Sequence, residues 1–139
     1  MRYLIIFFIF ISCSTNKQLN KSLSTEGFKE RALCQCIVLG QESRKDYSTR
    51  KLLPYDPVSL VLYDSIIIKN LKPVLKEIDL DSINRADKVT EAATGKQVYN
   101  LCMKYYKSKN LKKIAKKQVK KAKKIKNLEE YISNHYPTF

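Results

Sequence analysis

The chain has 139 residues, which is enough for one domain with a modest hydrophobic core. Its three glycines and four prolines are too few for a turn-rich β-sandwich, so the composition favours an all-α fold, a small single-domain helical bundle. Lysine and arginine outnumber aspartate and glutamate by 27 to 13, and the formal charge of +14 predicts affinity for acidic surfaces such as anionic lipid, an acidic protein or nucleic acid.

The first residues carry the pattern of an export signal. Arg2 precedes an unbroken apolar run from Tyr3 to Ile11, which Ser12 and Cys13 follow. The run is too short to span a bilayer as a stable helix, which favours a signal peptide over residues 1–12. A cysteine directly after a small residue resembles the lipobox of bacterial lipoproteins, and this resemblance implies lipidation of Cys13 and a periplasmic, membrane-anchored chain. Ordinary secretory cleavage nearby is the alternative, and in both cases the mature chain works outside the cytoplasm.

Three further regions are expected after the signal. Residues 13–27 are polar and lack periodicity, which predicts a flexible tether. A helical domain is expected over residues 28–134. Residues 135–139 are expected to form a frayed tail.

The first helix of the domain is expected to open near Ser24 or Thr25 and to run from Phe28 to Leu39. Gly40 is its expected stop signal. Residues at helical spacing in this segment would form an inward-facing stripe: Phe28, Ala32, Leu33, Cys36 and Ile37.

A second helix is expected to start at Asp56 and Pro57, because aspartate is a good N-cap and proline fits the first helical position. Residues 58–72 are apolar nearly all round, which predicts the central buried helix of a small domain. The β-branched residues here would also suit two short strands, but the cap and the length favour one helix. Pro73 is expected to end or kink this helix, and Val74 to Ile78 would add a turn.

The polar segment from Asp79 to Gly95 is expected to be a long loop or a loosely packed short helix. A helix resumes near Lys96, with one apolar face: Val98, Leu101, Cys102 and Tyr105. Ser108 would cap the next helix, which carries a long stripe: Leu111, Ile114, Ala115, Gln118, Val119, Ala122 and Ile125. Asn127, with Glu130 three residues later, resembles a capping box for a short last turn.

Twelve lysines lie between Lys104 and Lys126. Their spacing of three and four residues complements the long apolar stripe, so they are first interpreted as the solvated face of an amphipathic helix. Contact with anionic lipid headgroups or an acidic protein is the functional alternative. The helix carries no aromatic residue to stack on bases, which argues against a nucleic-acid partner.

The sequence offers no constellation of catalytic or cofactor-binding residues, so we expect no enzyme, no cofactor and no metal site. The single histidine, His135, lies four residues from the C-terminus, where a rigid site is not expected. Asp79 and Asp81 suggest a calcium loop, but the positions after them lack its remaining ligands and its glycine. Cys34 and Cys36 lack the second ligand pair of a zinc site.

Besides Cys13, the chain has Cys34, Cys36 and Cys102, and an oxidising compartment favours one disulfide with one thiol left over. Cys34 and Cys36 point to nearly opposite sides of a helix and cannot bridge each other. Cys36 is the better partner for Cys102, because it shares the apolar face with Phe28. Three buried free thiols are the alternative.

Two blocks of the sequence together resemble the type VI secretion amidase immunity proteins of the fourth family. The first, KERALCQCIVLG from Lys29 to Gly40, has an Ala-Leu pair and then a cysteine and an aliphatic residue: Ala32, Leu33, Cys36 and Ile37. The second, YNLCMKYYKSKNLKKIAKKQV from Tyr99 to Val119, has a cysteine, an aromatic stretch, and a serine and leucine that open a helix: Cys102, Tyr105, Tyr106, Ser108 and Leu111. The resemblance covers roughly residues 28–121.

This resemblance implies a small, all-helical, periplasmic protein that is typically a homodimer. It implies that the chain binds a cognate peptidoglycan amidase, a cysteine endopeptidase, and blocks its active site. It also supports the pairing of Cys36 with Cys102. The segment from Asp79 to Gly95 is the candidate plug for the cleft of the amidase, with six candidate contact residues: Asp79, Asp81, Asn84, Arg85, Asp87 and Glu91. A plain connection is the alternative for this segment.

A different function remains open beside this one. The chain would then be a structural or envelope-binding lipoprotein, anchored at Cys13, with its lysine-rich helix face on anionic lipid or wall polymer. That function predicts binding that weakens with salt and no dedicated protein partner.

Overall fold

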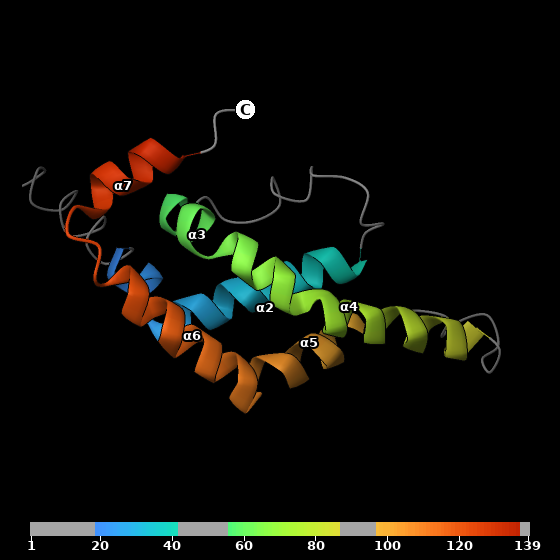
Figure 1. Cartoon of the computed structure of the whole chain (residues 1–139). Helices are drawn as coiled ribbons and strands as arrows, with labels where there is room; N and C mark the ends of the chain where they lie inside the picture. Colours follow the sequence, from blue (N-terminus) through green and yellow to red (C-terminus); the bar gives the residue numbers. More distant parts are fainter. Residues whose placement is uncertain (1–18, 42–55, 87–96, 137–139) are drawn as a thin grey trace, which may run out of the picture.

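The computed structural model describes residues 19–41, 56–86 and 97–136, and these parts of the chain are predominantly helical (Figure 1). Within those ranges no strand occurs, which confirms the predicted small all-α fold. Residues 19–22 form a helical turn, and the longer helices follow in chain order: α2 (Thr25–Gln41), α3 (Pro57–Leu62), α4 (Asp64–Ala86), α5 (Val98–Tyr106), α6 (Lys109–Ala122) and α7 (Leu128–His135).

Helix α2 is central to the packing, because α4, α5 and α6 all contact it. In Figure 1, α2 lies between α4 and the consecutive helices α5 and α6. The rings of Phe28 and Tyr63 meet edge to face, with their centroids 5.0 Å apart. The buried core draws on all four of these helices and the residue before α4: Phe28, Ala32, Cys36, Tyr63, Ile67, Leu71, Leu75, Ile78, Val98, Cys102, Leu111, Ala115, Val119 and Ala122.

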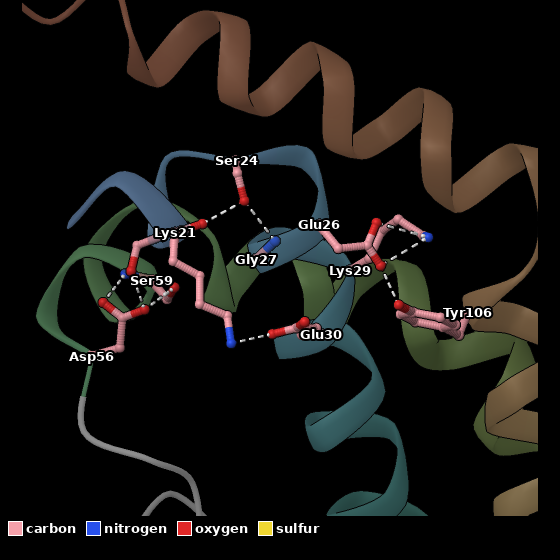
Figure 2. Close-up of polar contacts among 10 residues, drawn as sticks. Lys21, Ser24, Glu26, Gly27, Lys29, Glu30, Asp56, Ser59 and Tyr106 are labelled. Carbon is pink, nitrogen blue, oxygen red and sulfur yellow. Dashed lines mark hydrogen bonds and ion pairs between the residues drawn. The ribbon is translucent and has the colours of Figure 1, made fainter. Parts of the chain in front are cut away.

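Ser24 is the N-cap of α2, at the start that the sequence predicts. Its hydroxyl oxygen accepts the backbone N–H of Gly27 at 2.9 Å and donates to the carbonyl of Lys21 at 2.6 Å (Figure 2). One side chain thus satisfies a free N–H of the helix and ties the preceding turn to it.

The predicted tether over residues 13–27 is wrong over its C-terminal part, because residues 19–27 belong to the folded domain. Ser22 is buried, and its hydroxyl donates to Asp56 Oδ2 at 2.8 Å. Hydrogen bonds to polar partners order this segment together with Leu23, which packs against the core, and apolar periodicity does not reveal such polar contacts. Residues 13–18, like the signal expected over residues 1–12, lie outside the described residues.

Gly40 does not stop α2, which continues to Gln41. A Cβ atom at Gly40 would lie 2.7 Å from Val98 Cγ1 and 3.1 Å from Ile78 Cδ1. Glycine therefore stands here because α4 and α5 pack closely against the end of α2, and no positive φ is involved.

The single central helix predicted after Asp56 is wrong, because the chain breaks at Tyr63 into α3 and α4. Its start is as expected: Asp56 caps α3 by accepting the Ser59 N–H at 3.1 Å, and Pro57 takes the first helical position. The Tyr63 backbone leaves helical geometry, with φ −123° and ψ −34°. The break lets both Tyr63 and Asp64 enter the interior, at 1% and 3% exposure.

Pro73 does not end the helix, which was one of its two predicted effects, since α4 passes through it and continues to Ala86. Leu71 and Leu75 are buried on either side of the proline, while Pro73 itself is exposed. Packing of the flanking turns keeps the helix continuous, and the hydrogen bond lost at Pro73 lies on the side that water reaches. The segment from Asp79, predicted to be a loop or a short helix, is therefore helical as far as Ala86, and residues 87–96 lie outside the described residues.

The C-terminal helices agree more closely with the prediction from the sequence. Helix α5 buries Val98 and Cys102, and Ser108 caps α6 by accepting the Leu111 N–H at 3.1 Å. The predicted stripe of α6 is buried at four positions: Leu111, Ala115, Val119 and Ala122.

The last helix, α7, contacts α3 and buries no residue of its own. Asn127 is its N-cap, but the amide of Asn127 donates to the Glu130 carboxylate at 2.6 Å and makes no cap bond to the backbone, so the two residues of the predicted capping box pair through their side chains without its backbone bonds. His135 still belongs to α7, one residue beyond the predicted domain end at residue 134. The last three residues of the predicted tail, 137–139, lie outside the described residues.

Candidate functional site

Cys36 of α2 and Cys102 of α5 form the predicted disulfide. Their Cα atoms are 5.7 Å apart, and both side chains are fully buried. The bond joins positions that are 66 residues apart in the chain. It therefore braces α2 and α5 covalently, and the surfaces that flank this pair are held on a rigid framework.

A buried ion pair joins α2 to the start of α4. Arg31 donates to both carboxylate oxygens of Asp64, from Nε to Oδ1 at 3.0 Å and from Nη2 to Oδ2 at 2.8 Å. Burial lowers the pKa of the Arg31 guanidinium, but the hydrogen bonds and charge of Asp64 outweigh burial and leave this pKa above its ordinary value. The guanidinium therefore stays charged inside the domain, where a two-pronged bond orients both partners.

Asp56 connects the N-terminal turn to α3. Its Oδ2 atom accepts the hydroxyl of Ser59 at 2.6 Å as well as that of Ser22. Figure 2 shows Asp56 and Ser59 close to the turn that precedes α2. These hydrogen bonds attach the N-terminal turn to α3 and fix the position from which the chain enters α2.

An exposed polar cluster lies along the N-terminal half of α2 (Figure 2). Lys21 pairs with Glu30 at 2.7 Å, and Lys29 lies 3.4 Å from Glu26 and 4.2 Å from the ring centroid of Tyr106. The Tyr106 hydroxyl donates to Glu26, and this bond, followed by Lys29, holds the pKa of Glu26 below its ordinary value. The same bond raises the pKa of Tyr106. The acidic groups of α2 are thus engaged by Lys21 of the preceding turn, by Lys29 of α2 itself and by Tyr106 at the end of α5.

Seven lysines of α6 form a continuous exposed face, called the α6 lysine face below: Lys109, Lys112, Lys113, Lys116, Lys117, Lys120 and Lys121. The opposite side of the helix is the buried stripe that packs against the bundle. The interpretation of these lysines as one face of an amphipathic helix is confirmed by their exposure, and the partners suggested for that face stay predictions.

Of the six residues predicted to contact a partner, the structure places four on α4 and not in a loop: Asp79, Asp81, Asn84 and Arg85. Of the two predicted alternatives, the loop is wrong for these four residues, and the helix they form continues α4, because burial of Ile78 and the turns before it carries the helix past Asp79. Asp79 and Asp81 are half-buried and, two residues apart on a helix, point to different sides. Asp87 and Glu91 lie outside the described residues.

The remaining residues considered in the sequence analysis are His135, Cys34 and Cys13. His135 is exposed at the end of α7, where its Nδ1 lies 2.8 Å from the Tyr131 carbonyl oxygen and its ring stacks on that of Tyr131. Cys34 is a half-buried free thiol, and the predicted lipidation site Cys13 lies outside the described residues.

Among the residues that the structure describes, no group of three or more histidine, cysteine, aspartate or glutamate side chains is placed to hold a metal ion. No helix in those ranges combines the length and the apolar character needed to cross a membrane.

The pairing of Arg31 with Asp64 was not foreseen from the sequence. A signal for it exists, because Arg31 follows Phe28 by three residues and so falls on the apolar stripe of α2. Asp64 likewise interrupts the apolar segment of residues 58–72. Two opposite charges, each inside an apolar helical face, predict a buried pair, since an unpaired charge there would be costly.

Comparison of the chain with protein-family models, with curated proteins and with solved structures finds no match.

Proposed function

We propose that this chain is an immunity protein of type VI secretion, a periplasmic protein that binds a peptidoglycan amidase and blocks its active site. The observation that carries the proposal is the arrangement of the two blocks that resemble the amidase immunity family. The block from Lys29 to Gly40 lies within α2, and the block from Tyr99 to Val119 spans α5 and α6. The bond between Cys36 and Cys102 joins the two blocks inside one core.

Stoichiometric inhibition needs a rigid surface and no catalytic group in the inhibitor. The disulfide and the buried pair of Arg31 and Asp64 supply this rigidity, because each links α2 to a different neighbouring helix. A preorganised surface loses little conformational entropy when it binds, which favours a tight complex.

The amidase is proposed to contact the end of the domain where α4 and α5 approach Gly40. Ile78 of α4 and Val98 of α5 both lie close to Gly40. Leu80, two residues after Ile78, and Tyr99, one residue after Val98, are the most exposed large apolar side chains of the described residues, at 51% and 62%. Exposed aromatic and aliphatic anchors with polar neighbours are typical of protein interfaces, and Asp79 and Asp81 belong to this end of α4.

A capture experiment tests the proposal. The chain from Ser14 to Phe139 contains every contact described above, and it would be produced under oxidising conditions and used as bait on periplasmic and secreted extracts. We expect it to retain a hydrolase that cleaves peptidoglycan peptides and that loses this activity when bound. Retention of no hydrolase at ordinary salt would contradict the proposed function.

A pair of matched variants tests the contact surface. The double variant Leu80→Gln/Tyr99→Ala removes the two exposed anchors and should weaken amidase binding at least tenfold, because central apolar anchors dominate interface energies. Tyr131→Ala removes a partly exposed tyrosine from α7 and should leave binding unchanged. Equal loss in both variants would place the amidase contact elsewhere.

A further inference from the structure

The α6 lysine face carries positive charge that the rest of the described chain does not balance. Ion pairs within the described ranges involve other helices: Lys21 with Glu30, Lys29 with Glu26, Arg31 with Asp64 and Lys104 with Glu77. None of the seven α6 lysines forms an ion pair with a carboxylate in those ranges, although the charge of Lys112 makes a small contribution to lowering the pKa of Glu26. No acidic residue occurs anywhere between Glu91 and Glu129.

This arrangement differs from an ordinary solvated helix face. Lys112, Lys116 and Lys120 follow one another at intervals of four residues, so each lies beside another positive charge. Like charges at this spacing destabilise a helix, and surface helices commonly interleave glutamate to avoid it. The helix α6 tolerates the repulsion because its other side is buried in the core.

The charges are also close enough to act together. Fourteen helical residues extend about 21 Å, since each adds about 1.5 Å. This length is only two to three Debye lengths at physiological salt, where one Debye length is about 8 Å, so the fields of neighbouring lysines overlap. An extended anionic surface would therefore interact with all seven lysines of the face simultaneously.

The residue types on the α6 lysine face indicate which class of partner it binds. Every cation between residues 96 and 126 is lysine, which acts as a point charge and lacks the planar fork with which arginine recognises phosphates and bases. No aromatic residue occurs in α6, so bases have nothing to stack on. Asn110 is the only exposed residue of α6 that is not lysine, and an apolar anchor of the kind that protein interfaces bury is absent from this helix face.

We propose that the α6 lysine face binds the headgroups of an anionic phospholipid bilayer. The helix would lie along the membrane surface without insertion, because its exposed side carries charge and no apolar residue. The proposal uses none of the residues proposed to contact the amidase and does not depend on lipidation of Cys13, so the two can fail separately.

Vesicle sedimentation tests the proposal with the chain from Ser14 to Phe139, which lacks Cys13. The vesicles contain phosphatidylcholine alone or phosphatidylcholine with about 30% phosphatidylglycerol, an anionic lipid of the kind that attracts basic surfaces. The test variant is Lys113→Gln/Lys116→Gln/Lys120→Gln on α6. Its control, Lys69→Gln/Lys72→Gln/Lys76→Gln on α4, removes the same charge from exposed positions with the same spacing. Glutamine has a helix propensity close to that of lysine, so both variants should fold.

We expect the unmodified chain to bind only the anionic vesicles and to dissociate as NaCl rises from about 0.1 M to about 0.5 M. Each lysine at the headgroups contributes about fivefold to partitioning, so the α6 variant should bind roughly a hundredfold more weakly. The α4 control should stay within a few-fold of the unmodified chain. Equal loss in both variants would show that net charge alone is responsible and would overturn the proposal, as would absence of binding to anionic vesicles.

A competition arm addresses nucleic acid as the alternative partner. A short oligonucleotide is added at the same negative charge concentration as the anionic lipid. Retention of the chain on the vesicles supports the proposal. Preferential binding to the oligonucleotide that is lost in the α6 variant would overturn it in favour of nucleic acid.

Discussion

The guanidinium of Arg31 reaches from α2 to the carboxylate of Asp64, the first residue of α4, and both side chains are buried. Asp64 stands where a helix begins, and a negative charge is favoured there by the unpaired N–H groups of the first turn. If α3 and α4 formed one continuous helix, that advantage would be lost. The break at Tyr63 and the buried pair are therefore consistent parts of one arrangement.

Removing one partner of this pair should be strongly destabilising. Asp64→Leu leaves Arg31 buried without its counter-ion, and we expect a loss of about 3–5 kcal/mol in the free energy of unfolding. In the double variant Arg31→Met/Asp64→Leu the uncompensated charge is gone, so most of that stability should return. Urea denaturation followed by circular dichroism measures both. A double variant less stable than Asp64→Leu would contradict this account of the pair.

The disulfide should contribute a large share of the stability of the domain. Closing a loop of 66 positions restricts the unfolded chain, and Cys102→Ser should lower the free energy of unfolding by about 4 kcal/mol. Cys34→Ser alters a free thiol and is the matched control, with an expected change within about 0.5 kcal/mol. Denaturation of the unmodified chain with and without a reductant should reproduce the difference. An equal effect of both substitutions would be inconsistent with a single bond between Cys36 and Cys102.

Gly40→Ala should destabilise the domain by about 1–3 kcal/mol, because the new methyl group would meet Val98 and Ile78 at contact distances that force a shift. Without that crowding, alanine would stabilise a helix relative to glycine by up to about 1 kcal/mol, so the sign of the effect is decisive. Thermal unfolding measures it. In a Val98→Ala background the cost of Gly40→Ala should shrink, since the nearest methyl group is removed.

Tyr63 should make the domain sensitive to alkaline pH. Burial, with a smaller effect from Asp56, raises the pKa of Tyr63 from 10.0 to about 12 in the folded state. A raised folded pKa contributes stability that is complete below pH 10 and is lost as pH rises towards 12. Tyr63→Phe should remove this part of the alkaline loss, which urea denaturation at pH 8 and pH 11 would measure.

At neutral pH the same substitution should cost about 1 kcal/mol or less, because the Tyr63 hydroxyl has no hydrogen-bond partner among the described residues. Tyr99→Phe removes an exposed hydroxyl and serves as the control. If Tyr63→Phe and the control lose the same stability between the two pH values, burial of Tyr63 has no part in the alkaline response.

Features set by neighbouring residues were predictable from the sequence. Ser24, Asp56 and Ser108 cap the helices that they were expected to start, because a cap depends on the residue itself and the next three. The pairing of Cys36 with Cys102 was also predictable, since the helical face of Cys36 and the count of cysteines both restrict the choice.

Features set by tertiary packing were not predictable in this way. The break at Tyr63 coincides with the burial of Asp64 against Arg31, which lies on another helix, and α4 continues through Pro73 where Leu75 and Ile78 are buried in the core. The polar residues after Asp79 favour a loop by composition, but they extend a helix whose preceding turns are already anchored. For the same reason the four candidate contact residues that the structure describes lie at the end of a helix and not in a loop.

The central claim is inhibition of a peptidoglycan amidase, and titration of a captured amidase with the oxidised chain tests it most directly. Hydrolysis of peptidoglycan is followed while the chain from Ser14 to Phe139 is added in increasing amounts. The account predicts a linear fall in activity that reaches zero at one equivalent, and a shallower curve for Leu80→Gln/Tyr99→Ala. Undiminished hydrolysis at a severalfold excess of the folded, oxidised chain would contradict it.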